Sequence, residues 1–212
     1  MFSTLKSLQW KLVFIFISIT FALMTAVYVL LNHQVEASFY ENFKMSIELG
    51  LDYRYWDTDI KPGLELMLSK NTDSPDTTVR EEVTAIERAQ REINTRFNLT
   101  DGRTCTVINI NDENWFVFTT DRRYNNNELL LRREIEESPN FIRALAEGKG
   151  DRRKIAHTVN DVFFDYAVML KESGAVMYFR YYKSEWGTFV NKFNRILVSS
   201  SFFAVIASLI IG

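Results

Sequence analysis

One long apolar segment near the N-terminus constrains this chain more than any other feature. Residues 12–31 include no charged residue and no proline, and their only polar members are Ser18, Thr20 and Thr25. At about 1.5 Å rise per residue, a helix of this length crosses roughly 30 Å of hydrocarbon. The segment therefore predicts a transmembrane helix over residues 12–32 that anchors the chain in a lipid bilayer.

The residues on either side of this segment predict its orientation. Lys6 and Lys11 precede it and no acidic residue occurs before Glu36, so residues 1–11 are expected to form a cytoplasmic tail. A cleaved secretory signal peptide is the alternative. The apolar run is long for a signal peptide, and residues 32–36 do not form a small-x-small cleavage site, which favours an uncleaved anchor.

The other end of the sequence is apolar again. Residues 196–212 carry no charge, but they are fewer than the roughly twenty residues that a spanning helix needs. We expect a second transmembrane helix over residues 193–212 that the sequence truncates, with a cytoplasmic part beyond it. The alternatives are a short C-terminal anchor and a buried helix.

The segment between the two apolar runs, residues 33–195, is long enough for one domain with a hydrophobic core, which we expect over residues 33–192. Apart from Lys6 and Lys11, 23 basic residues stand against 27 acidic ones, which gives a net charge of about −4. This balance is typical of a solvated extracellular or periplasmic domain and argues against a nucleic-acid-binding protein. Cys105 is the sole cysteine, so no intramolecular disulfide can form.

Helical periodicity dominates the first half of this domain. Apolar residues recur every fourth position through residues 35–47, which predicts that the first helix continues out of the membrane. Apolar residues at helical spacing between Val79 and Phe97 predict a second helix whose charges lie on the solvent side.

Strands and short helices are predicted after Phe97. Residues 104–110 and 115–120 are rich in β-branched and aromatic residues and predict a hairpin that turns at residues 111–114. Ser138-Pro139 begins a short helix that Gly148 ends. Three more strands are expected between Arg153 and Lys183.

The last two strands also allow a prediction of register. A two-residue loop at Ser173-Gly174 gives one apolar face and one mixed face, and a shift by one residue would mix them. The pairs expected on the apolar face are Leu170 with Met177, Val168 with Phe179, and Tyr166 with Tyr181. Those expected on the mixed face are Met169 with Tyr178, Ala167 with Arg180, and Asp165 with Tyr182.

Three stretches carry a resemblance to a known family: VINI-NDENWFVFTTD, ESPNFIRALAEGKGDRRKIAH and DVFFDYAVMLKESGAVMYFRYYKSEW. In pattern and order they resemble the extracytoplasmic PAS-like (single Cache) sensor domain of bacterial sensor histidine kinases. The resemblance implies an α+β fold, with a five-stranded antiparallel sheet and long N-terminal helices between two transmembrane helices. The chain departs from the family where Asn-Asp-Glu-Asn replaces the usual Asp-x-x-Gly of the first turn.

The resemblance also implies partners and an output. It implies a membrane-bound parallel homodimer that senses an unknown ligand or partner protein outside the cytoplasm. The second span would connect it to an ATP- and Mg-dependent histidine kinase that phosphorylates a response regulator. None of those cytoplasmic parts lies within the 212 residues, and no cofactor is expected in this chain.

The residues themselves show no catalytic constellation. The two histidines, His33 and His157, and the single cysteine make a transition-metal site improbable, and no glycine-rich phosphate loop or nucleophile elbow is present.

The best candidate ligand site is the mixed face of the last hairpin, with Asp165, Tyr178, Arg180 and Tyr182. A buried arginine beside tyrosines offers a planar fork of donors to a carboxylate. The alternative is an internal Asp165–Arg180 pair on diagonal positions, which needs no ligand.

Two hypotheses about function remain open. The first is the input region of a signal-transduction receptor, chiefly a sensor histidine kinase, that passes a stimulus across the membrane by helix shifts. The sensor region of a diguanylate cyclase or a chemoreceptor would have the same features. The second is a complete small membrane protein with an outward binding or scaffolding domain and no catalytic output.

Overall fold

The computed structural model describes residues 2–52, 58, 60–69, 79–100, 102–110, 116–124, 127–158, 161–170 and 173–211. The chain divides into two compact units. One consists of Met1–Phe39 with Trp186–Gly212, and the other is Tyr40–Glu185.

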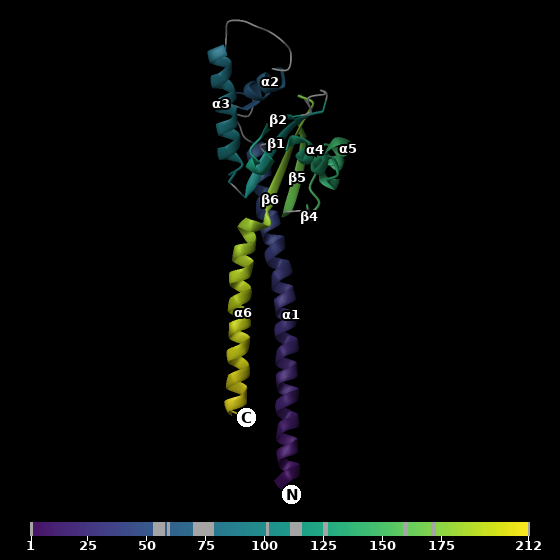
Figure 1. Ribbon diagram of the computed structural model, residues 1–212, viewed down its shortest axis with the longest axis vertical. Coiled ribbons are helices and arrows are strands. Elements are labelled where there is room, and N and C mark those ends of the chain that lie inside the picture. Colours follow the sequence, from purple (N-terminus) through teal and green to yellow (C-terminus); the bar gives the residue numbers. More distant parts are fainter. Residues whose placement is uncertain are drawn as a thin grey trace. The chain divides into compact units, whose positions relative to one another are not determined.

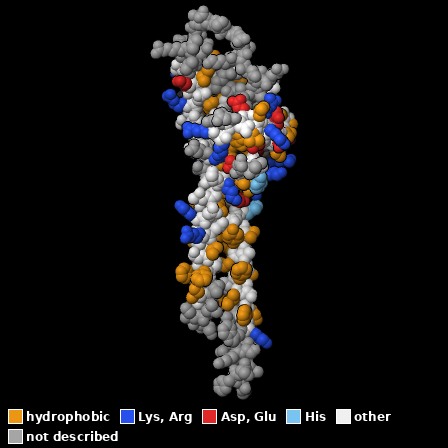
Figure 2. Space-filling view, viewed as in Figure 1, with side chains coloured by type: hydrophobic (Ala, Val, Ile, Leu, Met, Phe, Trp, Pro, Cys, Tyr) orange, Lys and Arg blue, Asp and Glu red, His pale blue; other side chains and the backbone are white. Residues whose placement is uncertain are grey.

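The first unit consists of helical segments from the two ends of the chain. They belong to two unbroken helices, α1 (Phe2–Leu51) and α6 (Lys183–Ile211). α1 ends in the second unit, and α6 begins there. Within the described residues, Phe14–Leu51 is the one stretch long and apolar enough to cross a membrane. Apolar side chains are exposed on the surface of this unit (Figure 2), among them Phe21 and Leu23.

Both threonine side chains in the apolar part of α1 form hydrogen bonds within the helix. Thr20 donates to the carbonyl of Phe16 at 2.9 Å, and Thr25 donates to the carbonyl of Phe21 at 2.8 Å. Such bonds keep the hydroxyl groups paired where no water is present. The helix predicted at residues 12–32 is therefore compatible with an apolar surrounding, while the second predicted span remains a prediction.

The second unit is an α+β domain built on an antiparallel sheet (Figure 1). The strand order is β2-β1-β6-β5-β3, and β4 also pairs with β5. The strands are β1 (Arg103–Asn109), β2 (Phe116–Thr119), β3 (Lys149–Gly150), β4 (Ile155–His157), β5 (Val162–Leu170) and β6 (Ala175–Tyr182). β6 lies in the middle of the order and is buried along its whole length.

The helices of this unit cover both faces of the sheet. They are the last turns of α1, α2 (Lys61–Ser69), α3 (Val79–Arg96), the short 3-10 helix η2 (Arg122–Tyr124), α4 (Glu128–Glu136) and α5 (Pro139–Glu147). The predicted helix from Val79 and the predicted helix from Pro139 are both confirmed. Gly148 ends α5 with a φ of 84°, the left-handed conformation that glycine adopts without strain.

One face of the sheet is an aromatic core. The ring of Phe179 on β6 lies 4.8 Å from that of Phe97, just after α3. From α1, the ring of Tyr40 lies 5.4 Å from that of Phe164, and the ring of Phe43 lies 5.4 Å from that of Tyr181. Aromatic pairs at these separations pack favourably in tilted or edge-to-face arrangements. This face is the one predicted to be apolar.

The opposite face combines a smaller core with polar side chains. α4 and α5 cover it through Leu131, Ile135, Phe141 and Ala144, all buried. Beside this core lie Asp165 of β5 and Arg180 of β6, which face the same side because directly opposite residues share a face.

Two predictions about the sheet are corrected. The sheet has six strands, whereas five were expected. The additional strand is β3, whose two residues are too few to show a strand pattern in the sequence. The β5–β6 register differs by two residues, since Leu170 pairs with Ala175 and Asp165 with Arg180. A shift of two keeps every side chain on its face, so the hydrophobic pattern fixes the faces but leaves the turn length undetermined. The turn predicted at residues 111–114 lies outside the described residues.

Gly174 gives a test of this longer turn. Its φ is 64°, where a side chain costs about 1 kcal/mol or more, so Gly174→Ala should lower the free energy of unfolding by about 1 kcal/mol. Ser173→Ala in the same turn loses one hydroxyl contact to the Leu170 carbonyl and should cost less. Denaturant unfolding of the detergent-solubilised chain measures the free energy of unfolding of both variants. An equal loss of stability in the two variants would contradict the left-handed conformation of Gly174.

Candidate functional site

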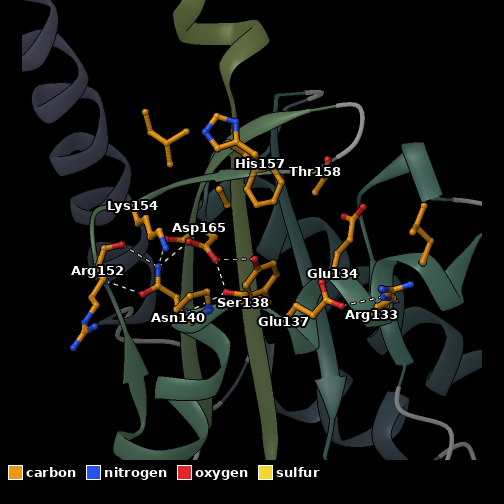
Figure 3. Close-up of a pocket in the computed structure, with 16 residues that line it drawn as sticks. Arg133, Glu134, Glu137, Ser138, Asn140, Arg152, Lys154, His157, Thr158 and Asp165 are labelled. Atoms are coloured by element: carbon orange, nitrogen blue, oxygen red, sulfur yellow. Dashed lines mark hydrogen bonds and ion pairs between the residues drawn. The ribbon is translucent and has the colours of Figure 1, made fainter.

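A pocket of about 760 Å³ opens on the mixed face of the sheet, between α4, the start of α5, and β4 (Figure 3). Its inner residues come from β5 and β6, and its outer residues come from the helices and from the segment before and along β4. The inner lining includes Phe163, Asp165 and Tyr178, and the outer lining includes Arg133, Glu137, Arg152, Lys154 and His157.

Asp165 is a buried carboxylate in the inner lining, with 2% of its surface exposed. It accepts hydrogen bonds from the Ser138 hydroxyl at 2.5 Å, the Tyr178 hydroxyl at 2.8 Å and the Asn140 amide at 2.7 Å. These neutral donors compensate in part for the loss of water around the charge. They also fix the orientation of the carboxylate (Figure 3).

The Ser138-Pro139 sequence explains why two of these donors lie there. Ser138 caps α5 and accepts hydrogen bonds from the backbone N–H of Asn140 and Phe141. A serine cap followed by proline at the first helical position is a favoured helix start. The cap therefore places the Ser138 hydroxyl and the Asn140 amide against Asp165.

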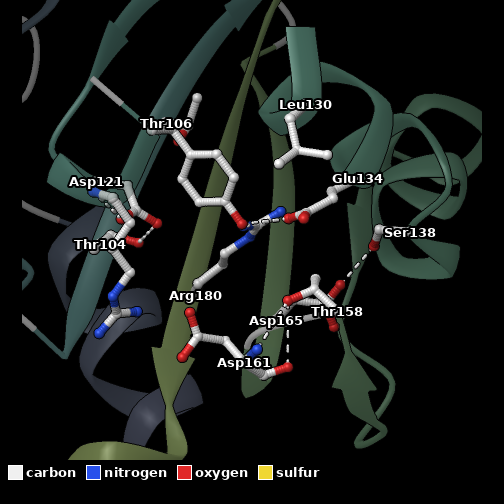
Figure 4. A network of polar contacts seen from close by, with 12 residues as sticks. Thr104, Thr106, Asp121, Leu130, Glu134, Ser138, Thr158, Asp161, Asp165 and Arg180 are labelled. Carbon is white, nitrogen blue, oxygen red and sulfur yellow. Dashed lines mark hydrogen bonds and ion pairs between the residues drawn. The ribbon is translucent and has the colours of Figure 1, made fainter. Parts of the chain in front are cut away.

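Arg180 lies behind the pocket lining and is 1% exposed. Its Nη1 donates to the Tyr124 hydroxyl and forms an ion pair with Glu134 Oε2, both at 3.0 Å, and lies 3.3 Å from the Tyr182 hydroxyl (Figure 4). The guanidinium also lies over the ring of Phe163, 4.5 Å from its centroid. Its Nε and Nη2 are buried and have no hydrogen-bond partner among the described residues.

A third carboxylate belongs to the same buried network. Asp121 accepts a hydrogen bond from the Tyr182 hydroxyl at 2.5 Å and, at 3.4 Å, from Thr104. Asp121 is thus connected to Arg180 through the Tyr182 hydroxyl, whereas Glu134 is the acidic residue that contacts the guanidinium directly among the described residues.

The four predicted site residues lie on the same face of the sheet, but only two of them line the pocket. Asp165 and Tyr178 line the pocket, whereas Arg180 and Tyr182 lie behind it and are not among its lining residues. Asp165 and Arg180 are directly opposite rather than diagonal, and the ion pair of Arg180 is with Glu134. The expected internal Asp165–Arg180 pair is therefore not the one that forms among the described residues.

The sequence prediction missed Glu134, Ser138 and Asn140. Their positions depend on how α4 and α5 pack on the sheet, which no periodicity shows. One signal was available: the Ser-Pro helix start implied a hydroxyl at a fixed place, but the predicted fold did not show that this place faces β5.

The histidines and the cysteine form no metal centre in the part of the chain that is described. His157 is exposed at the outer edge of the pocket, at the end of β4. Cys105 is fully buried in β1, and burial raises the pKa of its thiol. Cys105 is thus a small buried group of the core.

No family model, curated protein or solved structure matches this chain. The similarity to Cache sensor domains therefore depends on the order of elements in the sequence and remains a prediction.

The buried tyrosines of the site predict an alkaline instability. Burial and the hydrogen bond to Glu134 raise the pKa of Tyr124 to about 12, and burial raises those of Tyr178 and Tyr182 as well. Above about pH 10 the unfolded chain loses phenol protons that the folded chain keeps, so the free energy of unfolding should fall as pH rises toward 12.

Phenolate absorbance during an alkaline titration measures this effect. The buried tyrosines should titrate only as the domain unfolds, and Tyr124→Phe should make the loss of stability with pH less steep. Titration of every tyrosine near pH 10 in the folded domain would contradict the site geometry.

Proposed function

We propose that this chain is the extracytoplasmic sensor region of a membrane receptor, most directly a two-component sensor histidine kinase. Three observations support the proposal: an apolar helix long enough to anchor the chain, an α+β domain, and a pocket lined by charged residues in that domain. In this proposal α1 anchors the domain, the domain lies outside the cytoplasm, and α6 leads toward the output part.

We further propose that the pocket binds a small carboxylate. The observation that carries this proposal is the unpaired Nε–Nη2 edge of buried Arg180. These two N–H groups form one side of the guanidinium fork, which matches the two oxygens of a carboxylate. Buried donors without partners cost about 1–3 kcal/mol each, so a ligand that pairs them gains that energy on binding.

The surroundings of Arg180 define how a ligand would reach it. Glu134, Phe163 and Tyr178 contact the guanidinium and also line the pocket. Entry therefore requires the Phe163 ring to move aside. Such a ligand would be held by the Nε and Nη2 donors of the guanidinium.

The outer lining favours anions. Arg152 and Lys154 are exposed at the pocket, and no hydrogen bond or ion pair of their side chains occurs within the described ranges. In contrast, Glu134 is paired with Arg180 and Glu137 with Arg133. The free positive charges at the entrance would raise the local concentration of a negatively charged ligand.

A panel of small mono-, di- and tricarboxylates tests the ligand proposal by thermal shift. A ligand at a hundredfold excess over its Kd stabilises the domain by about 2.7 kcal/mol, so at least one acid should raise the Tm of the wild type. Arg180→Lys keeps the charge but loses the planar fork, and it should weaken binding at least about tenfold.

Arg143→Lys is the matched control, because Arg143 is a partly exposed residue of α5 that pairs with Glu147 away from the pocket. It should bind as the wild type does. A panel without any stabilising acid, or equal shifts in Arg180→Lys and wild type, would refute the carboxylate proposal.

Cysteine labelling tests the orientation of the chain. Leu129 on α4 is 81% exposed, whereas native Cys105 is fully buried and should not react. Leu129→Cys should therefore react with a membrane-impermeant maleimide on intact cells, and Lys11→Cys in the predicted tail only after lysis. The reverse pattern would place the domain in the cytoplasm and end the sensor proposal.

A further inference from the structure

The short strand β3 is joined to one side of α1 by three polar contacts. Tyr40, Lys44 and Glu48 are spaced four residues apart, so they share a face of the helix. Lys44 Nζ lies 2.9 Å from Asp151 Oδ2, Glu48 Oε1 lies 2.5 Å from Lys149 Nζ, and the Tyr40 hydroxyl donates to the Asp151 carbonyl at 2.5 Å. The edge of the sheet and the last turns of α1 are thus bonded directly.

Arg152, the residue after Asp151, is bonded to the wall of the pocket. The Arg152 N–H donates to the Asn140 side-chain oxygen at 2.8 Å, and the Asn140 amide donates to the Arg152 carbonyl at 3.0 Å. Asn140 is 2% exposed and also bonds Asp165. A Cβ on Gly150 would lie 1.7 Å from the Asn140 carbonyl oxygen, so the backbone of β3 lies tightly against α5.

Residues 149–152 therefore connect α1 to the pocket through adjacent peptide units. Asp151 holds α1, while the Arg152 backbone holds Asn140, and Asn140, Arg152 and Asp165 all line the pocket. We propose that residues 149–152 form a latch that couples occupancy of this pocket to the position of α1. The inference builds on the proposed sensor function and specifies how the same pocket is read.

The strength of the contacts suits a reversible latch. The side chains of Lys44, Glu48, Lys149 and Asp151 are 26–41% exposed, and ion pairs with such access to water are individually weak and screened by salt. The hydrogen bond from Lys44 holds the pKa of Asp151 below its usual value, so the pair is formed at neutral pH. The binding of a ligand at Asn140 and Arg152 would then be enough to break these ion pairs, while the aromatic contacts of Tyr40 and Phe43 keep α1 packed on the sheet.

The helix itself extends the effect beyond the domain. α1 is an unbroken helix from Phe2 to Leu51, so Lys44 and Glu48 belong to the same helix as the apolar segment. Helix displacements of an ångström or two are an established means of switching.

A covalent occupant of the pocket tests the latch without knowledge of the natural ligand. Lys154→Cys places a thiol in the exposed part of the lining, and benzyl methanethiosulfonate then attaches an aromatic group there. Hydrogen–deuterium exchange of the full chain in nanodiscs reports on α1. After labelling, the amides of residues 44–51 should exchange at least about threefold faster, because release of the latch permits local opening.

Two variants break the latch from either side. Asp151→Asn and Lys44→Gln each remove the ion pair, and the amides of residues 44–51 should already exchange faster in both. When either is combined with Lys154→Cys, the label should add a smaller increase than it does alone, because only the Glu48–Lys149 pair and the Tyr40 hydrogen bond remain to be released. Leu129→Cys with the same label is the control, because Leu129 is exposed on α4 and outside the lining, and it should leave α1 unchanged.

Three results would overturn the latch: unchanged exchange in α1 after labelling at position 154, wild-type exchange in both ion-pair variants, or an equal effect of the label at position 129. These outcomes do not depend on the carboxylate. If no acid stabilises the domain but the label accelerates exchange in α1, the latch stands and the carboxylate proposal fails.

Discussion

The buried guanidinium of Arg180 is the interaction on which the mixed face of the sheet depends. It lies near the end of β6, the strand in the centre of the sheet, and only 1% of the residue is exposed to solvent. A buried charge is tolerated only with partners, and α4 supplies Glu134 while η2 supplies Tyr124. Through these bonds one strand residue determines where η2 and α4 lie, and so determines one wall of the pocket.

Asp165 likewise determines the position of the opposite wall of the pocket, which α5 forms. Its carboxylate is bonded by the cap residue of α5 and by Asn140, which fixes the start of that helix against β5. The two charged residues are directly opposite on neighbouring strands, yet each is bonded mainly to a covering helix. The pocket lies where these two sets of bonds diverge, which explains why a cavity remains there rather than a packed core.

The two faces of the sheet therefore have different physical characters. The aromatic face packs against α1 and α3 by contacts that are dense and non-directional, and such packing resists local change. The mixed face and the β3 edge are held by hydrogen bonds and partly exposed ion pairs, which can exchange partners at smaller cost. The binding site that we propose lies on the second face, and the latch that we propose reaches α1 through the β3 edge, in agreement with this division.

Much of this arrangement can be predicted from the sequence, because it depends on local pattern. The apolar run at residues 12–31 defines a helix fit for a membrane, the spacing after Val79 defines α3, and the alternation in β5 and β6 places Asp165, Tyr178, Arg180 and Tyr182 on one face. The rest is a property of the tertiary structure. A period of two does not distinguish registers that differ by two residues, so only the fold decided that Asp165 lies opposite Arg180. Only the packing of helices on the sheet decided that Glu134, rather than Asp165, pairs with Arg180, because these residues are distant in sequence and no local pattern relates them.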